Sequence, residues 1–105
     1  MSLPSISASD FDRLLFEVPL LVVKFTAPWC QPCRIYAAIV AAAAQSHPEI
    51  TFVEVDLERE PALARRWQVR GIPSTLGFRN GALAFQVTGL LNSEALEKHL
   101  QTLNG

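Results

Sequence analysis

The sequence predicts an α/β fold in which helices cover both faces of a central mixed β-sheet. Three observations lead to this expectation. Apolar, β-branched segments alternate with segments of helical periodicity, an Asn-Gly pair separates two later apolar segments, and an amphipathic segment closes the chain. Alternating strands and helices predict parallel strands, and the tight turn adds an antiparallel pair. Half of the 105 residues are hydrophobic and 18% are charged, so we expect one domain over residues 1–105.

The first half of the chain predicts a helix, a buried strand and a second helix. SASDFDRLLFEV (residues 7–18) has helical spacing, with Ser7 or Ser9 as its cap. LLVVKFTA (residues 20–27) is mostly apolar and β-branched, as expected of a strand that is buried on both faces. Residues 31–46 contain no glycine and only one proline, which falls in the first turn of the predicted helix, and His47-Pro48 ends this helix.

The second half predicts a strand, a short helix, a hairpin and a last helix. ITFVEVDL (residues 50–57) is the strand, and EPALARRWQV (residues 60–69) is the short helix, with Gly71 beyond its end. The Asn80-Gly81 pair between STLGF and ALAFQV predicts a two-residue hairpin turn. NSEALEKHLQTL (residues 92–103) predicts a helix with one apolar face, formed by Leu96, Leu100 and Leu103.

Charge and composition argue against several classes of partner. The formal net charge is −1 with acidic and basic residues interspersed, so we expect no binding to nucleic acid or to a membrane. The longest apolar runs are far shorter than the roughly 20 residues of a membrane span. The first residues do not resemble a signal peptide, so we expect a cytoplasmic protein, although removal of a leader would leave the same sequence.

The two cysteines, Cys30 and Cys33, lie where the first strand gives way to the second helix. Three residues are nearly one helical turn, so both sulfurs face the same side and can close a small disulfide ring. Cys30 falls at the helix N-terminus, where free N–H groups and the helix dipole favour a negative charge. Thiolates in such sites have pKa values of roughly 3.5 to 7.5, against about 8.5 for an unperturbed cysteine. Cys30 is therefore the candidate nucleophile and Cys33 the resolving thiol.

Two structural roles for the pair compete with this redox role. A disulfide that closes so short a loop constrains the unfolded chain little, so it would be a poor staple. A zinc site needs four ligands, and His47 and His99 lie in unrelated segments, so only a symmetric dimer would supply four cysteines. We expect no metal ion and no cofactor besides the redox-active cysteine pair, because no metal or nucleotide motif is visible.

Around the cysteines the chain resembles the thioredoxin family. VVKFTAPWCQPC is similar to the family's active-site segment, VRGIPS to its second signature, and FRNGALAFQVTGLL to its closing hairpin. The similarity extends over residues 6–104 with the spacings intact. It implies a thioredoxin fold, with a central mixed sheet of four to five strands flanked by helices on both faces, and a thiol–disulfide oxidoreductase.

The resemblance also implies roles for the residues around the cysteines. Cys30 would attack a substrate disulfide, and Cys33 would then attack the mixed disulfide and release the reduced substrate. Trp29 would pack beside the pair, and Pro32 would hold the start of the helix in shape because its fixed φ suits that position. From the residues alone, Trp29 could also be an ordinary core aromatic.

A second set of residues would form the substrate groove. Pro73, in cis, would direct the backbone of Ile72 toward an extended substrate segment, which would pair with it as a strand pairs with a sheet edge. Thr88, Gly89 and Leu90 would form the far wall of this shallow groove. From the residues alone, Pro73 could also be an ordinary turn proline.

Two charged residues depart from the family pattern. Lys24 stands where thioredoxins commonly carry a buried Asp, and Glu54 stands where their partner is often Lys. A buried Lys or Glu alone would be costly, so we expect the two to form an ion pair. We hypothesise that Glu54 assists deprotonation of Cys33 while Lys24 stabilises a thiolate. In the alternative, Lys24 extends to water and has no catalytic role.

Gln31 stands where the commonest thioredoxin motif has glycine. Gln favours a helix over Gly by roughly 0.5–1 kcal/mol, but it does so in the oxidised and the reduced protein alike. Only an interaction that differs between the two states shifts the reduction potential, such as the Gln31 amide donating to the Cys30 thiolate. We therefore expect Gln31 to affect the choice of partner more than the potential. Thr26 and Ser74 also differ from the usual residues and would reshape the groove.

The sequence as a whole predicts a reductant of protein disulfides. The proline before Cys33 resembles reducing thioredoxins, and regeneration implies a flavin-dependent thioredoxin reductase as electron donor. The alternative is a thioredoxin-fold binding or chaperone-like module with little reductase activity, which Lys24 and Gln31 would favour. A third alternative is a periplasmic or secreted relative that has lost its leader. We expect a monomer.

Overall fold

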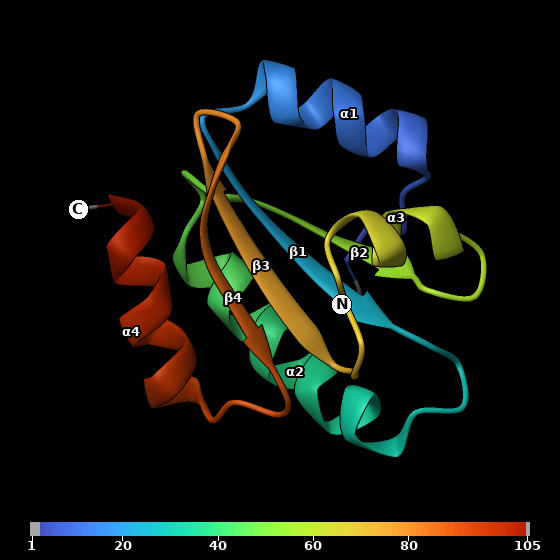
Figure 1. The fold of residues 1–105 in the computed structure, drawn as a ribbon. Helices are drawn as coiled ribbons and strands as arrows, with labels where there is room; N and C mark the ends of the chain where they lie inside the picture. The colour runs from blue at the N-terminus through green and yellow to red at the C-terminus, as the bar shows by residue number, and fades with distance from the viewer. Residues whose placement is uncertain (1–2, 105) are drawn as a thin grey trace.

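The computed structural model describes residues 3–104, and its centre is a four-stranded mixed sheet (Figure 1). The strands are β1 (Leu20–Thr26), β2 (Thr51–Asp56), β3 (Ser74–Arg79) and β4 (Ala82–Thr88), in the order β2-β1-β3-β4. The helices are α1 (Ala8–Glu17), α2 (Gln31–Ser46), α3 (Pro61–Arg66) and α4 (Ser93–Asn104). The predicted fold class and order of elements are confirmed.

Strand β1 runs through the middle of this sheet. It is parallel to β2 and antiparallel to β3, and all residues from Leu21 to Phe25 are buried. β3 continues into β4 through Asn80 and Gly81, whose φ angles of 50° and 81° are those that an Asn-Gly hairpin turn requires. Both predictions, a strand covered on its two faces and a tight hairpin, are therefore confirmed.

The segment before α1 adds a short stretch of pairing at the outer edge of β2. The N–H of Ile6 donates to the carbonyl of Glu54 at 3.0 Å, and the N–H of Glu54 donates to the carbonyl of Pro4 at 2.9 Å. This parallel bridge, centred on Ser5, covers the edge of β2 at Glu54. It was not predicted from the sequence.

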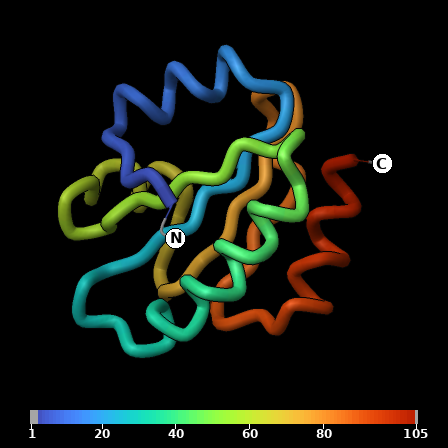
Figure 2. The backbone as a smooth tube through the Cα atoms, turned by 180° about the vertical axis from the view of Figure 1, so that it is seen from behind, coloured from blue at the N-terminus to red at the C-terminus, as the bar shows by residue number. Residues whose placement is uncertain are grey.

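Two apolar cores lie on opposite faces of the sheet. Helices α1 and α3 cover one face, where Phe11 and Leu63 pack with Leu21, Val23 and Phe25 of β1. Helices α2 and α4 cover the other face and lie side by side in the view from behind (Figure 2). The side chains of this second core include Val22, Tyr36, Val40, Phe52 and the three predicted leucines Leu96, Leu100 and Leu103.

The ends of α1 and α2 lie close to the positions that the sequence predicts. Ser7 is the N-cap of α1, because its Oγ accepts the N–H of Asp10 at 3.2 Å while the Asp10 carboxylate accepts the N–H of Ser7 at 3.4 Å. Helix α2 spans the predicted residues 31–46 and ends before His47.

Within residues 3–104, no helix has the length and apolar character needed to cross a membrane.

Helix α3 is shorter than the predicted residues 60–69 and ends at Arg66. Trp67 leaves the helix and packs its ring edge-on against Phe11 and Phe78, with ring centroids 5.9 and 5.0 Å apart. Gln68, rather than the expected glycine, adopts the left-handed conformation that follows the helix, with a φ of 54°. Packing between distant aromatic residues therefore ends this helix.

His47 links the C-terminal end of α2 to α4. Its Nε2 lies 2.6 Å from Oε1 of Glu97, and its Nδ1 lies 3.1 Å from Oε2 of Glu49. The side chain is only 14% exposed. Burial lowers the pKa of His47, but the hydrogen bonds to Glu49 and Glu97 outweigh it, and the pKa lies above its ordinary value of 6.5.

The raised pKa of His47 predicts a stability that depends on pH. Its contribution is fully present below the unfolded-state pKa of about 6.5 and is lost as the pH rises through the higher pKa of the folded state. From about pH 6 to pH 8 we expect wild type to lose up to about 1 kcal/mol more unfolding free energy than His47→Gln does. Urea unfolding at both pH values measures the difference, and an equal loss in the two proteins would contradict the prediction.

Candidate active site

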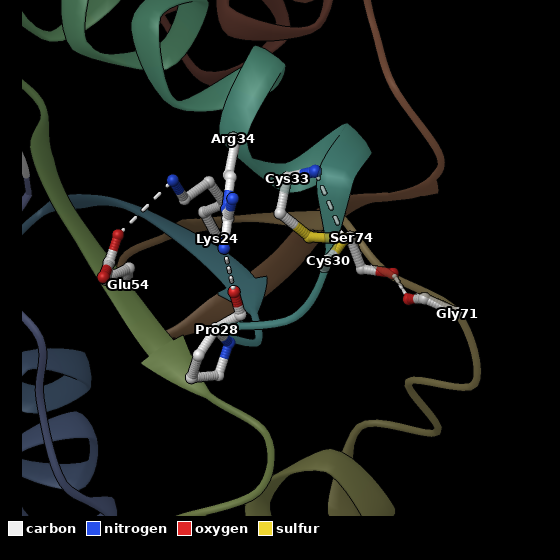
Figure 3. Close-up of a disulfide and its surroundings, with 8 residues drawn as sticks. All are labelled: Lys24, Pro28, Cys30, Cys33, Arg34, Glu54, Gly71 and Ser74. Carbon is white, nitrogen blue, oxygen red and sulfur yellow. Dashed lines mark hydrogen bonds and ion pairs between the residues drawn. A yellow bond between two sulfur atoms is a disulfide. The ribbon is translucent and has the colours of Figure 1, made fainter.

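The two cysteines form a disulfide at the N-terminus of α2 (Figure 3). Their Cα atoms are 5.2 Å apart, and both residues are buried. Cys30 is the N-cap of the helix, and the backbone N–H of Cys33 donates to the Cys30 sulfur at 3.2 Å. An N–H in the first turn and the helix dipole both favour negative charge at the sulfur they face. The local geometry therefore favours Cys30 over Cys33 as the thiolate.

The residues predicted to form a groove lie together beside this disulfide. Ile72 packs against the small apolar cluster that contains both cysteines, and the peptide bond between Ile72 and Pro73 is cis. The N–H of Gly89 donates to the carbonyl of Pro73 at 2.7 Å, and Ser74 is opposite Thr88 in the sheet. Leu90 follows with an exposed side chain.

Lys24 and Glu54 form the predicted ion pair. Nζ of Lys24 lies 3.3 Å from Oε1 of Glu54, and the side chains are 3% and 24% exposed (Figure 3). The alternative in which Lys24 extends to water is therefore wrong. Alternate residues of a strand share a face, so Lys24 lies on the same face of β1 as Val22, which packs in the core beneath α2. The pair thus connects this core to the edge of the sheet.

Trp29 is 63% exposed, and its Nε1 donates to Oε2 of Glu58 at 2.6 Å. It is therefore not a core aromatic, and its ring is not part of the apolar cluster around the disulfide. Gln31 and Pro32 are exposed in the first turn of α2. Among the hydrogen bonds of residues 3–104, the Gln31 amide donates none to Cys30 in this oxidised form.

Two further contacts near the disulfide were not predicted. Nη2 of Arg34 donates to the carbonyl of Pro28 at 3.0 Å and ties α2 to the loop before Cys30 (Figure 3). The hydroxyls of Tyr36 and Thr75 lie 2.6 Å apart in the buried core, so one donates to the other. Tyr36 is three residues after Cys33 and Thr75 is two residues after Pro73, but this spacing alone does not predict the bond.

The chemistry available at this site is thiol–disulfide exchange. Across residues 3–104 no cluster of histidine, cysteine or acidic side chains is able to hold a metal ion. The reactive group is the disulfide itself, with the residues predicted to form a groove beside it and a partly buried ion pair on the sheet below α2.

Comparisons with known proteins agree with this geometry. The family model described as Thioredoxin matches residues 2–102. A thioredoxin H-type of Ricinus communis is 35% identical over 86 residues, which cover 79% of this chain and 73% of that protein. Thioredoxin 1 of a Nostoc species is 38% identical over 89 residues, or 80% of this chain and 82% of that protein. The crystal structure of oxidised mitochondrial thioredoxin 3 from Saccharomyces cerevisiae matches 94% of this chain and 93% of its own, with a TM-score of 0.88 and 27% identity.

Proposed function

Since the chain belongs to the thioredoxin family and is a protein-disulfide reductase, we propose that Cys30 is its attacking cysteine and Cys33 its resolving cysteine. The observation that carries this assignment is the backbone N–H of Cys33, which donates to the Cys30 sulfur at 3.2 Å. In the reduced protein the same N–H and the helix dipole would stabilise a thiolate on Cys30. Cys33 lies three residues further on, in the first turn of the helix, and would act in the second exchange step.

The proposed reaction moves two electrons to the substrate in two exchange steps. The Cys30 thiolate attacks one sulfur of the substrate disulfide, forms a mixed disulfide and releases the other substrate sulfur, which takes up a proton. Cys33 then loses its proton, attacks the Cys30 sulfur and releases the second substrate thiol. The substrate gains two electrons and two protons, and the cysteine pair becomes a disulfide.

The substrate segment is proposed to bind beside Ile72 and Pro73. Ile72 packs against the cysteine cluster, so a backbone that pairs with it would lie close to the disulfide. Thr88, Gly89 and Leu90 would line the other side, where the bond from Gly89 to Pro73 fixes their position. The exposed Leu90 offers apolar contact to a partner.

Proteins with disulfides are the proposed substrates, and a thioredoxin reductase is the proposed electron donor. The donor would return two electrons to the cysteine pair, which would then need no further cofactor. Both cysteines of the chain belong to this pair, which suits a reducing compartment such as the cytoplasm. We propose that the protein acts as a monomer, because one chain supplies both cysteines and the groove.

Lys24 and Glu54 are proposed to handle protons for the resolving step. Lys24 lies on the sheet face that α2 covers, and Cys33 lies one turn before the Tyr36 that packs there. A buried ammonium favours a thiolate nearby, and Glu54 is exposed enough to exchange protons with water.

Trp29, Gln31 and Pro32 are proposed to tune the site from its exposed rim, through the shape that they present to a partner.

Separate replacement of the cysteines tests the assignment of the nucleophile. In an insulin-reduction assay with dithiothreitol, Cys30→Ser should lose all activity above the background of dithiothreitol alone. Cys33→Ser should still attack and accumulate a mixed disulfide with insulin, which mass spectrometry of acid-quenched samples detects. Activity that survives in Cys30→Ser would contradict the assignment, and an inactive wild type would contradict the reductase function.

The role of the ion pair is tested with Glu54→Gln, which leaves the Lys24 ammonium without its partner. The pH profile of insulin reduction should move to higher pH, because Cys33 loses the carboxylate that is proposed to assist its deprotonation. The unfolding free energy should fall by roughly 2 kcal/mol, less than for a fully buried pair. Glu17→Gln, which removes an exposed carboxylate on α1, is the matched control. An unchanged profile in Glu54→Gln would rule out the proposed role.

A further inference from the structure

The buried polar side chains of this protein gather at one place. Among residues 3–104, the buried polar or charged residues are Lys24, Ser74 and Thr75, and the fully buried Tyr36 adds a phenol hydroxyl. Lys24 is opposite Thr75 in the pairing of β1 with β3. Ser74 and Thr75 begin β3 directly after Pro73, and Tyr36 follows Cys33 in α2. All four therefore lie at the end of the sheet where the disulfide and the proposed groove lie.

The bond between Tyr36 and Thr75 joins the two halves of the site. The hydroxyl oxygens are 2.6 Å apart, and both residues are completely buried. Tyr36 is three residues after Cys33 on the inner face of α2, and Thr75 is two residues after Pro73 on β3. The bond therefore ties the helix that carries the cysteines to the strand that carries the groove. Burial raises the pKa of Tyr36, against the smaller opposing effect of the Thr75 bond, so the phenol keeps its proton at neutral pH.

Stability alone does not require this pair of hydroxyls. Removing one partner leaves a buried polar group unpaired, which is costly, but replacing both partners by apolar groups of the same shape is often nearly neutral. Phenylalanine and valine have the shapes of Tyr and Thr without the hydroxyls. A core of apolar residues surrounds the pair, so the fold would tolerate that replacement. A hydrogen bond does, however, fix distance and direction more narrowly than apolar packing does.

We propose that Tyr36 and Thr75 are positioning residues that fix the spacing between Cys30 and the backbone of Ile72 and Pro73. An extended substrate segment that pairs with that backbone then presents its disulfide to the Cys30 sulfur at the distance that exchange requires. This inference rests on the proposed function, because it takes Ile72 and Pro73 as the substrate-binding segment. A small disulfide that does not fill the groove would not depend on the spacing.

The test uses the full chain with Tyr36→Phe, Thr75→Val and the double variant, each assayed with insulin and with hydroxyethyl disulfide. Each single variant should unfold at a lower urea concentration than wild type, and the double variant should recover most of that loss. The double variant should still reduce insulin with a kcat/KM about tenfold below wild type, mainly through KM. Its reaction with hydroxyethyl disulfide should stay within about twofold of wild type. Thr75→Ser, which keeps the hydroxyl, should keep the wild-type KM for insulin.

Four results would overturn the inference. Wild-type kinetics with insulin in the double variant would mean that the bond has only a structural role. An equal loss with insulin and with hydroxyethyl disulfide would place the effect on the thiols rather than on the groove. A wild type that is inert toward both disulfides would overturn the proposed function together with this inference. If the double variant does not fold, equal KM values for insulin in Thr75→Val and Thr75→Ser would also refute it.

Discussion

Strand β1 is hydrogen-bonded along both edges and covered by helices on both faces, and the reactive groups take their positions from it. The chain leaves the end of β1 at Thr26 and reaches the N-terminus of α2 after four residues, which places Cys30 at the helix cap. β3 begins opposite Phe25, so Pro73 lies at the same end of the sheet. β2 brings Glu54 beside Lys24. Because a slip by one residue would turn the buried side chains of β1 to the wrong faces, apolar burial fixes the register and hence the site.

The local signals in the sequence were enough to predict all eight elements, because caps, turn residues and periodicity act over a few residues. The features that these local signals did not predict depend on contacts between segments that are distant in the sequence. Trp67 ends α3 early, and the ring of Phe85 occupies the space that a side chain at Gly77 would need, where the β3–β4 register shifts. In the site, the cysteines and Pro73 follow from motifs, and the pairing of Lys24 with Glu54 follows from the cost of a lone buried charge. The bond between Tyr36 and Thr75 could not be predicted, because Tyr also suits an apolar core and Thr suits any strand.

Each polar group near the disulfide is paired because burying it without a partner would cost free energy. A buried ammonium needs a carboxylate, and a buried hydroxyl needs a hydrogen-bond partner, so in these two pairs each group fixes the position of a partner from a different element. Lys24 with Glu54 couples β1 to β2, and Tyr36 with Thr75 couples α2 to β3. Within residues 3–104, these buried polar groups therefore lie at the end of the sheet that carries the disulfide. At the opposite ends of the same strands, the buried residues of β1 and β3 are apolar.

The pKa of the Cys30 thiol in the reduced protein tests most directly whether the start of α2 makes Cys30 the nucleophile. The rate of iodoacetamide alkylation as a function of pH gives this pKa, and peptide mass spectrometry identifies the cysteine that is modified. A thiolate at the helix N-terminus predicts that Cys30 is alkylated first, with a midpoint clearly below the about 8.5 of an unperturbed cysteine. A midpoint near 8.5 with equal modification of Cys30 and Cys33, or first reaction at Cys33, would contradict it.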